Sequence, residues 1–409
     1  MKKEIFTDKY YTHFDTKKHH KNYEERIKNP NWVSKHGFYP FIHFQIGMNK
    51  YTDDGSGKKH IKYKNRDIYY AAHIDRYIYQ YYGNRLNNKY NEYAKNKGIN
   101  RVSIAYRNCT RGKCNINFAR EVFEFIVKKK SAFVFVGDFS KFFDKLNHKY
   151  LKQQLVKLND GKQLDVAEYA IYKNIVHFSY LEAKDIEKEK GKFRRDMRTF
   201  NKYFDTIDFQ YFKSKYLKKN ECDYGIPQGS SISAVYANVY MIEFDKEINN
   251  YVTSIGGMYR RYCDDIIIVI PMMYQEKKDL KYNTIVKNII NIKEKIPNLN
   301  LNDDKIQQFF YSYKNIEKIC GNSNLINYLG FTFDGMCVQI RDKSLFKFYC
   351  RAYKKIKKVK QNSDERSFNA GKKAVYKSYT HLGVKKFSKD HGNFLTYAYK
   401  AHTIFDESD

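Results

Sequence analysis

Two stretches decide the fold of this chain: SAFVFVGDF at residues 131–139 and MYRRYCDDIIIVIP at residues 258–271. Both contain short runs of β-branched and aromatic residues, which is typical of buried strands. In the second stretch, MYRRY and IIIVI flank Cys-Asp-Asp, so the pattern predicts two strands joined by a tight turn. When the two stretches are neighbours in one antiparallel sheet, Asp138, Asp264 and Asp265 meet at one point.

Three clustered carboxylates need a chemical reason. Without nearby basic partners they repel one another, so such a cluster makes sense only with bound cations. Magnesium prefers oxygen ligands, and two such ions roughly 3.5–4 Å apart can assist phosphodiester synthesis from nucleoside triphosphates. The pattern therefore predicts a two-ion Mg²⁺ site, with Mn²⁺ as a substitute. The alternative interpretation is that Asp264 and Asp265 are only favourable hairpin-turn residues.

The rest of the chain predicts an α+β architecture with one antiparallel sheet flanked by helical regions. Aromatic and polar residues alternate up to Ile46, and Gly55 and Gly57 favour a hairpin turn after it. Another hairpin is expected around residues 327–340, followed by a Lys-rich helical tail. Before that tail, helical patterns are found in five places: from Ile68 onward, at 118–127, through most of 151–220, at 234–252 and at about 276–296.

The composition favours a polyanionic partner. Lys and Arg total 76 against 45 Asp and Glu, a formal charge of +31, and cationic side chains gain affinity by releasing phosphate counterions. The other interpretation is that an AT-rich genome inflates Lys, so that part of the charge only solubilises the surface. The chain has no long apolar run and no signal-like start, and its seven cysteines are scattered. We therefore expect a cytoplasmic protein with reduced thiols and no membrane partner.

Five motifs occur in a family-specific order. FVGDFSKFFDKLNH, GIPQGSSISAVYANVYM and YRRYCDDIIIVIP resemble motifs A, B and C of reverse transcriptases, and LNLNDDK and NYLGF resemble motifs D and E. The resemblance covers roughly residues 60 to 335 and implies a right-hand polymerase fold. It implies three domains: N-terminal extension and fingers (1–130), palm with a helical insertion at about 151–220 (131–335), and helical thumb (336–409).

The resemblance also implies roles for individual residues. Asp138 and Asp264 match the principal metal ligands, Asp265 assists them, and the backbone carbonyl of Phe139 contacts the metal that carries the nucleotide. Phe143 matches an aromatic plate beneath the incoming sugar, where a ring would clash with a ribose 2′ hydroxyl and favour deoxynucleotides. The other interpretation of Phe143, as of its neighbour Phe142, is a core residue.

Two further groups of residues follow from these motifs and from IKYKNRDIYYAAHIDRYIYQ and AYRNCTRGKCNINFA, which resemble two fingers segments of the family. The glycines of the loop at 225–229 let the backbone approach a base or sugar closely, and Lys305 matches a proposed general acid for pyrophosphate. Lys64 is almost as well explained as ordinary surface charge. The residues expected to bind nucleotide are Arg66, Lys64, Phe143, Gln228, Gly229 and Lys305. Those expected to contact primer or template are Tyr328, Leu329, Gly330, Arg107 and Lys113.

Among reverse transcriptases, the chain resembles the bacterial antiphage defence-associated enzymes, particularly the class-two type. YPFIHF near the start and NFLTYAYKA near the end are further points of similarity, and about seventy residues after motif E are enough only for a thumb. This resemblance implies a non-coding RNA partner that is copied into cDNA from deoxynucleoside triphosphates. The alternatives are a template-independent or protein-primed DNA polymerase, a retron or group II intron type enzyme, or a binding protein with a dead polymerase fold.

Overall fold

The computed structural model describes residues 5–53, 59–110, 112–361, 364–385 and 392–406. The chain divides into two compact units, each assembled from separate stretches of sequence. Unit 1 comprises residues 1–109, 139–247 and 290–300, and unit 2 comprises residues 110–138, 248–289 and 301–409. Two helices, α10 (Ile242–Ser254) and α12 (Lys281–Glu294), run from one unit into the other.

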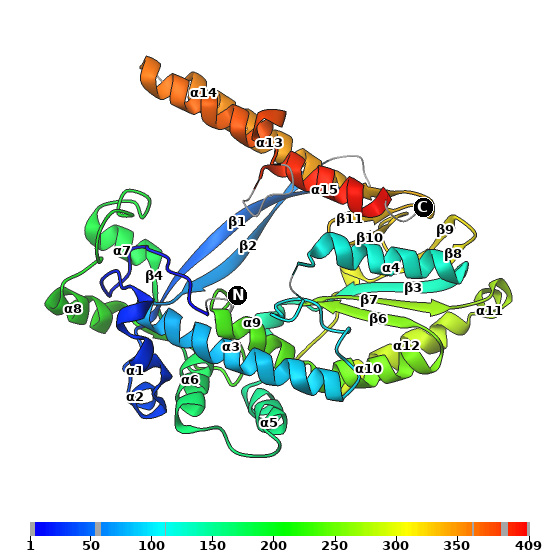
Figure 1. The fold of residues 1–409 in the computed structure, drawn as a ribbon, viewed down its shortest axis with the longest axis horizontal. Coiled ribbons are helices and arrows are strands. Elements are labelled where there is room, and N and C mark those ends of the chain that lie inside the picture. Colours follow the sequence, from blue (N-terminus) through cyan, green and yellow to red (C-terminus); the bar gives the residue numbers. More distant parts are fainter. Residues whose placement is uncertain (1–4, 54–58, 111, 362–363, 386–391, 407–409) are drawn as a thin grey trace. The chain divides into compact units, whose positions relative to one another are not determined.

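The described part of unit 2 contains a five-stranded antiparallel sheet with the order β6-β7-β3-β8-β9 (Figure 1). Strand β3 lies at its centre, between β7 and β8, and six of its residues are buried, including Phe133, Val134 and Phe135 at 0% exposure. Such two-sided burial explains its uninterrupted apolar sequence. The five strands are β3 (Ser131–Asp138), β6 (Met258–Tyr262), β7 (Asp265–Pro271), β8 (Gln307–Ser312) and β9 (Asn315–Cys320).

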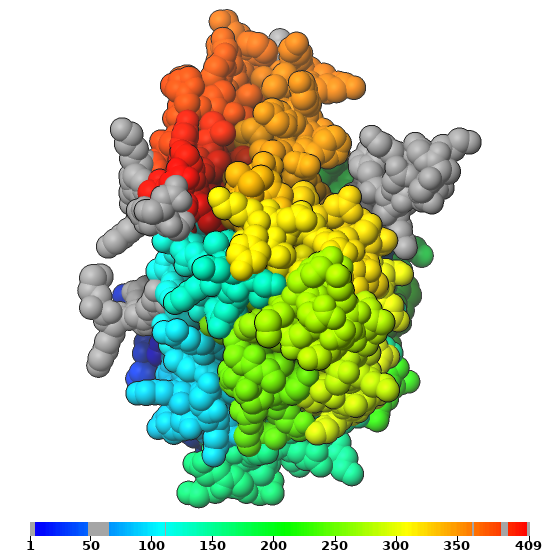
Figure 2. All heavy atoms as spheres, turned by 90° about the vertical axis from the view of Figure 1, so that its right-hand side faces the viewer, coloured from blue at the N-terminus to red at the C-terminus, as the bar shows by residue number. Residues whose placement is uncertain are grey.

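One core joins this sheet to the helices and the small sheet of the same unit. Helix α4 (Asn115–Lys129) buries Ile116, Val122 and Ile126 against β3 and against the three-stranded sheet β10-β11-β12. Figure 2 shows the surface of β8 and β9, in yellow, beside that of α11 (Tyr274–Lys278). An ion pair of 2.6 Å between Lys277 of α11 and Glu317 of β9 joins the helix to this edge of the sheet. The other elements are β10 (Ile326–Tyr328), β11 (Phe331–Phe333), β12 (Val338–Ile340), α13 (Asp342–Lys360), α14 (Glu365–Tyr379) and α15 (Phe394–Asp406).

Unit 1 is built around the long hairpin of β1 (Phe41–Asp53) and β2 (Lys59–Tyr70) and a set of helices (Figure 1). Strand β1 also pairs in parallel with β4 (Ser179–Glu182), and β4 pairs with the two-residue strand β5 (Lys218–Lys219). Helix α3 (His73–Asn96) packs against α9 (Ser231–Tyr240). The remaining helices are α1 (Glu24–Lys28), α2 (Pro30–Ser34), α5 (His148–Leu158), α6 (Val166–Val176), α7 (Ala183–Lys190) and α8 (Thr206–Tyr216).

These elements confirm the α+β class, the two predicted strands with their turn, and the helix at 118–127. The helix predicted from Ile68 onward begins only at His73, because Ile68 to Tyr70 still pair with β1. The helix predicted at 276–296 is two helices, which separate where Leu280 takes a φ of +55°. The turn predicted at Gly55 and Gly57 lies outside the described residues.

Two further absences apply to the described residues alone. None of the seven cysteines, all of which the structure describes, forms a disulfide. In the ranges given above, no helix combines the length and the apolar character that crossing a membrane requires.

Candidate catalytic centre and nucleotide pocket

The three predicted aspartates meet at one end of the unit 2 sheet. Asp138 is the last residue of β3 and lies directly opposite Asp265, the first residue of β7, in the antiparallel register. Directly opposed residues of an antiparallel pair point to the same face, with Cα atoms about 4.5–5.5 Å apart. Asp264 precedes Asp265 in the turn, so the strand pairing brings all three carboxylates together.

The β6–β7 turn holds these carboxylates in a strained backbone conformation. Tyr262 pairs with Asp265, which leaves only Cys263 and Asp264 between the strands. Cys263 has a φ of +62°, a region that suits the first position of a type II′ hairpin turn but normally favours glycine. The guanidinium of Arg261, which has no exposed surface, donates a 2.8 Å hydrogen bond to the carbonyl oxygen of Cys263. Arg261 therefore fixes the turn from inside the protein.

The electrostatics of the cluster favour a cation. Desolvation, followed by the charges of Asp264 and Asp138, raises the pKa of Asp265 to about 7. Asp138 is 6% exposed, and among the described residues its Oδ1 has no hydrogen-bond partner although it is buried. An unsatisfied carboxylate oxygen beside two other carboxylates is an unfavourable arrangement that a bound cation would relieve.

Two basic side chains, however, lie close to the cluster, which corrects the assumption of acids without basic partners. The Nζ atom of Lys305 forms an ion pair with Oδ2 of Asp138, and the charges of Lys305 and Arg341 partly offset the rise in the pKa of Asp265. Lys305 reaches this place because the backbone N–H of Asn302 donates to the carbonyl of Asp138 at 2.9 Å. The predicted role of Lys305 as a general acid stays a prediction.

The donor set fits a hard divalent cation. Asp138, Asp264 and Asp265 offer carboxylate oxygens, which such ions prefer. Oδ1 of Asp138 is buried and free of hydrogen bonds in the part of the chain that the structure describes. These three side chains are therefore the candidate ligands, and Lys305 occupies the other oxygen of Asp138 in this structure.

The residues predicted to support a primer lie in the β10–β11 turn of unit 2. Tyr328 is 3% exposed and belongs to the core, so only its neighbours offer surface to a partner. Leu329 and Gly330 take φ values of +47° and +92°, and the amide of Asn115 donates to the Leu329 carbonyl at 2.9 Å. Their contact with a primer stays a prediction.

The predicted nucleotide loop lines a cavity of about 1040 Å³ in unit 1. Phe143, Gln228 and Gly229 are among the lining residues, and Phe142 beside them is buried. The carbonyl of Gln228 accepts a 2.8 Å hydrogen bond from the backbone N–H of Tyr69. Gly229 has a φ of +125°, and a Cβ atom there would lie 2.4 Å from the carbonyl oxygen of Tyr69. Only glycine lets the loop pack so closely against β2.

The other predicted residues are placed as follows. Arg66 is exposed on β2, whereas the side chain of Lys64 lies outside the described residues. Arg107 is 7% exposed and donates to Asn91 at 2.7 Å and to the side chain of Asn100 at 2.6 Å. Its guanidinium therefore makes hydrogen bonds within unit 1. Its contact with nucleic acid stays a prediction.

Two predicted residues remain. Lys113 is exposed in the loop before α4. Phe139 is 2% exposed and packs against Phe142 and Phe244. The assignments of Lys113 to template and of the Phe139 carbonyl to a metal stay predictions.

Sequence reasoning missed Arg261 and the place of Lys305 beside Asp138. Arg261 directly precedes the Tyr-Cys-Asp-Asp string, and a charged residue in an otherwise apolar hairpin was the available signal. Lys305 gave no comparable signal, because many lysines stand in polar loops of this chain.

Comparison with known proteins gives the family. A protein-family sequence model described as reverse transcriptase (RNA-dependent DNA polymerase) matches residues 119–333, just over half of the 409 residues. No curated protein sequence matches the chain.

Solved structures give weaker likenesses. The apo telomerase of Candida tropicalis, truncated from its C-terminal domain, is 13% identical at a TM-score of 0.42 over 78% of this chain and 60% of its own. Telomerase from Candida albicans, solved with a TWJ fragment of telomeric RNA, is 10% identical at 0.40 over 93% and 58%. The chain thus spans about 60% of the length of these telomerases. The α+β fold is consistent with a right-hand polymerase, and by the family model this chain belongs to the reverse transcriptase family.

Proposed function

We propose that the protein is an RNA-directed DNA polymerase that copies a bound non-coding RNA into cDNA with two Mg²⁺ ions. The observation that carries the proposal is the register of β3 and β7, which sets Asp138 opposite Asp265 and next to Asp264. Nucleotidyl transfer requires carboxylates at one point, and the family assignment supports the same chemistry.

The residues of unit 2 have distinct parts in this proposal. Asp138, Asp264 and Asp265 hold the ions, while Arg261 keeps the turn from relaxing. Bound Mg²⁺ would activate the attacking 3′ hydroxyl and neutralise charge on the leaving pyrophosphate. When Asp138 binds a metal ion, Lys305 leaves this carboxylate and pairs with a substrate phosphate. The ammonium group of Lys305 can then donate a proton to the leaving pyrophosphate.

The residues of unit 1 select the nucleotide. Phe143 lines the cavity with an aromatic face, and a ring at that place excludes a ribose 2′ hydroxyl. Gln228 offers an amide that can pair with a base or sugar. Arg66 supplies a cation for the triphosphate from β2.

The proposed biological setting is antiphage defence in a bacterium. Its support is the resemblance of YPFIHF, NFLTYAYKA and the five ordered motifs to the defence-associated enzymes of the class-two type. The net charge of +31 fits a protein that keeps an RNA bound. We propose a dedicated non-coding RNA as that partner.

The test is to incubate the purified protein and its co-purified RNA with deoxynucleotides and Mg²⁺, and to sequence the RNA and any DNA made. We expect cDNA complementary to one abundant RNA, and no product from Asp264→Asn with Asp265→Asn. Asp279→Asn, an exposed acid on the same unit, is the control for a changed charge and should keep full activity.

Several outcomes would contradict the proposal. DNA that lacks any counterpart in the bound RNA would indicate template-independent synthesis. DNA that stays covalently attached to the protein after RNase treatment would indicate protein priming. Random cellular RNA among the co-purified molecules would remove the dedicated template, and activity that survives the double substitution would remove the catalytic centre.

A further inference from the structure

The nucleotide loop forms only one part of the cavity wall in unit 1. Much of the rest comes from the N-terminal residues 5–12, helix α3, and the turn that follows α7 and carries Arg194 and Arg198, while residues of β1, β2 and the loop at 106–108 also line it. At about 1040 Å³, the cavity is at the upper limit for pockets that hold one small molecule. The added walls therefore enclose more space than a single nucleotide requires.

The charge of these walls has one sign. Lys9, Arg76, Arg194 and Arg198 line the cavity, and none of the described lining residues is an Asp or a Glu. Within those same residues, Nη1 of Arg76 and Nη1 of Arg194 are buried without a hydrogen-bond partner. Buried guanidinium N–H groups without acceptors are costly to leave unpaired. The cavity is therefore suited to an anion that supplies several acceptors.

The start of helix α9 adds further donors. Ser230 stands at its N-cap without capping the helix, and its buried Oγ has no partner among the described residues. Ser230 and Ser231 both line the cavity. A helix N-terminus presents free N–H groups and a positive dipole end, so α9 favours a phosphate at the same wall as the arginines.

Aromatic and amide side chains lie between the cations. The ring of Tyr10, which is 57% exposed, and the ring of Tyr11 line the cavity. Gln80 and Asn84 line it from α3. Rings that stack on bases, placed among cations that track a backbone, are the combination by which proteins bind single strands. A free triphosphate would use the cations but leave the remaining surface empty.

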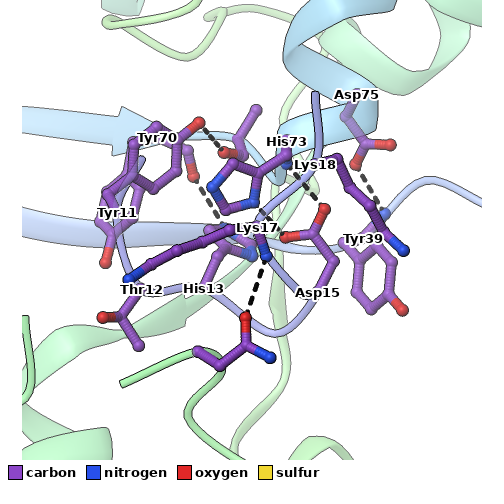
Figure 3. Close-up of polar contacts among 12 residues, drawn as sticks. Tyr11, Thr12, His13, Asp15, Lys17, Lys18, Tyr39, Tyr70, His73 and Asp75 are labelled. Atoms are coloured by element: carbon purple, nitrogen blue, oxygen red, sulfur yellow. Dashed lines mark hydrogen bonds and ion pairs between the residues drawn. The ribbon is translucent and has the colours of Figure 1, made fainter. Parts of the chain in front are cut away.

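Buried polar contacts hold the N-terminal segment in place (Figure 3). The hydroxyl of Tyr11 donates to the carbonyl of Ala71 at 2.7 Å, and the hydroxyl of Thr12 donates to the carbonyl of Met197 at 2.7 Å. Asp15 accepts from the backbone N–H of His73 at 2.9 Å and pairs with its ring at 2.8 Å. The segment is thereby tied both to the start of α3 and to the turn that carries Arg194 and Arg198.

The two inner arginines are likewise fixed. Nη2 of Arg76 donates to the carbonyl of Thr7, and the guanidinium of Arg194 lies 3.8 Å above the ring centre of Phe44. Each keeps Nη1 free, so the cations are positioned before any ligand arrives. Such preorganisation lowers the entropy cost of binding.

We propose that this wall is a binding site for single-stranded RNA, in which Arg76, Arg194 and Arg198 hold successive phosphates and the exposed ring of Tyr10 stacks on a base. The site rests on the proposed function, because it would receive the unpaired part of the template. It extends that function to the N-terminal segment and to the turn after α7, which lie outside the polymerase motifs.

The test measures RNA binding without chemistry. A fluorescent, unstructured 12-nucleotide RNA is titrated with the full-length protein, freed of co-purified RNA, in EDTA, and anisotropy gives Kd at several salt concentrations. Arg198→Glu is compared with Arg195→Glu as the control. Both substitutions change the charge by the same amount, but Arg195 is exposed and does not line the cavity. We expect Arg198→Glu to weaken binding about tenfold and Arg195→Glu less than about twofold.

A second variant addresses the inner arginines. Arg76→Gln with Arg194→Gln should weaken binding further and reduce the salt slope by about 0.7 for each phosphate that the variant no longer neutralises. Because Arg194 packs on Phe44, thermal unfolding of this variant is measured as well. If the double variant does not fold, the comparison of Arg198→Glu with Arg195→Glu still tests the site, because Arg198 is exposed.

The outcomes separate this inference from the proposed function. Equal weakening by Arg198→Glu and Arg195→Glu would overturn the RNA site and leave polymerase activity untouched. A higher KM for deoxynucleotides on a short primer-template, with unchanged RNA affinity, would show that the cavity holds triphosphate and would also overturn it. Loss of RNA affinity in the variants, when the wild-type protein makes no cDNA, would support the site and contradict the proposed function. Equal binding of single-stranded DNA of the same sequence would overturn the choice of RNA.

Discussion

The crowding of carboxylates at the β6–β7 turn predicts that Asp265→Asn stabilises the metal-free protein while abolishing its activity. In the folded chain the pKa of Asp265 is raised from 3.8 to about 7, so ionising this group opposes folding. The full rise corresponds to about 4 kcal/mol. Asp265 is exposed to solvent, which screens the charges, and we therefore expect a gain of about 1–2 kcal/mol.

The pH dependence of this gain has a definite sign. Below the unfolded pKa of 3.8 the carboxyl is protonated in both states, so Asp265→Asn changes little at about pH 3. Between about 4 and 7 the unfolded state releases the proton and the folded state keeps it, so the wild type loses stability as the pH rises. Above about 7 the loss is complete, and the variant shows its whole advantage.

The assay is thermal unfolding of wild type, Asp265→Asn and the exposed control Asp279→Asn in EDTA and in Mg²⁺. We expect Asp265→Asn to melt about 2–4 °C higher at pH 8 in EDTA, with no such rise for the control. Mg²⁺ should stabilise the wild type more than the variant, since a ligand that binds only the folded state raises its stability. Equal melting temperatures at pH 8, or equal gains from Mg²⁺, would refute the idea of a crowded metal site.

Three further predictions concern the backbone and the pocket. Gly229→Ala should lower the stability of unit 1 by about 2 kcal/mol or more and raise the KM for deoxynucleotides, because its Cβ would meet the carbonyl of Tyr69 at 2.4 Å; unfolding curves and steady-state kinetics would reveal it. Phe143→Ala should increase ribonucleotide incorporation, measured by alkaline cleavage of the product, and unchanged discrimination would count against the gate. Arg261→Met should lower kcat at least about tenfold with a small effect on KM, because the carbonyl of Cys263 loses its 2.8 Å hydrogen bond and the turn loses its position; a change confined to KM would disagree.

The centre of the unit 2 sheet was predictable from sequence because its cues are local. The apolar runs around Asp138 and Asp265 fix the strands, and a two-residue gap fixes the hairpin, so the alignment of acids follows from strand geometry. The start of α3 was harder to predict from sequence, since Ile68 to Tyr70 fit both a strand pattern and a helix pattern. Pairing with β1 decides between them, and pairing is not a property of that segment alone.

The walls of the unit 1 cavity depend on contacts between distant segments. Asp15 meets His73 across 58 positions, and Thr12 meets the carbonyl of Met197 across 185. The predicted helical insertion contributes β4, which pairs in parallel with β1. The periodicity of the sequence does not predict such pairings. The entropy cost of closing long loops, and the contact energy that offsets it, depend on the whole fold. The motif residues Phe143 and Gln228 were therefore found, whereas Arg76 and Arg194 were not.

The β6–β7 turn supports a catalytic role even when its motif is set aside. A structural hairpin would place Gly or Asn where Cys263 takes a φ of +62°, and it would separate like charges. Here the strained residue, the carboxyl with a raised pKa and the unpartnered Oδ1 of Asp138 all fall at one end of a well-packed sheet within the described residues. Proteins tolerate such local conflicts mainly where function requires them. A cation bound by Asp138, Asp264 and Asp265 would resolve the electrostatic conflicts together, which is why the turn is best understood as an ion-binding site.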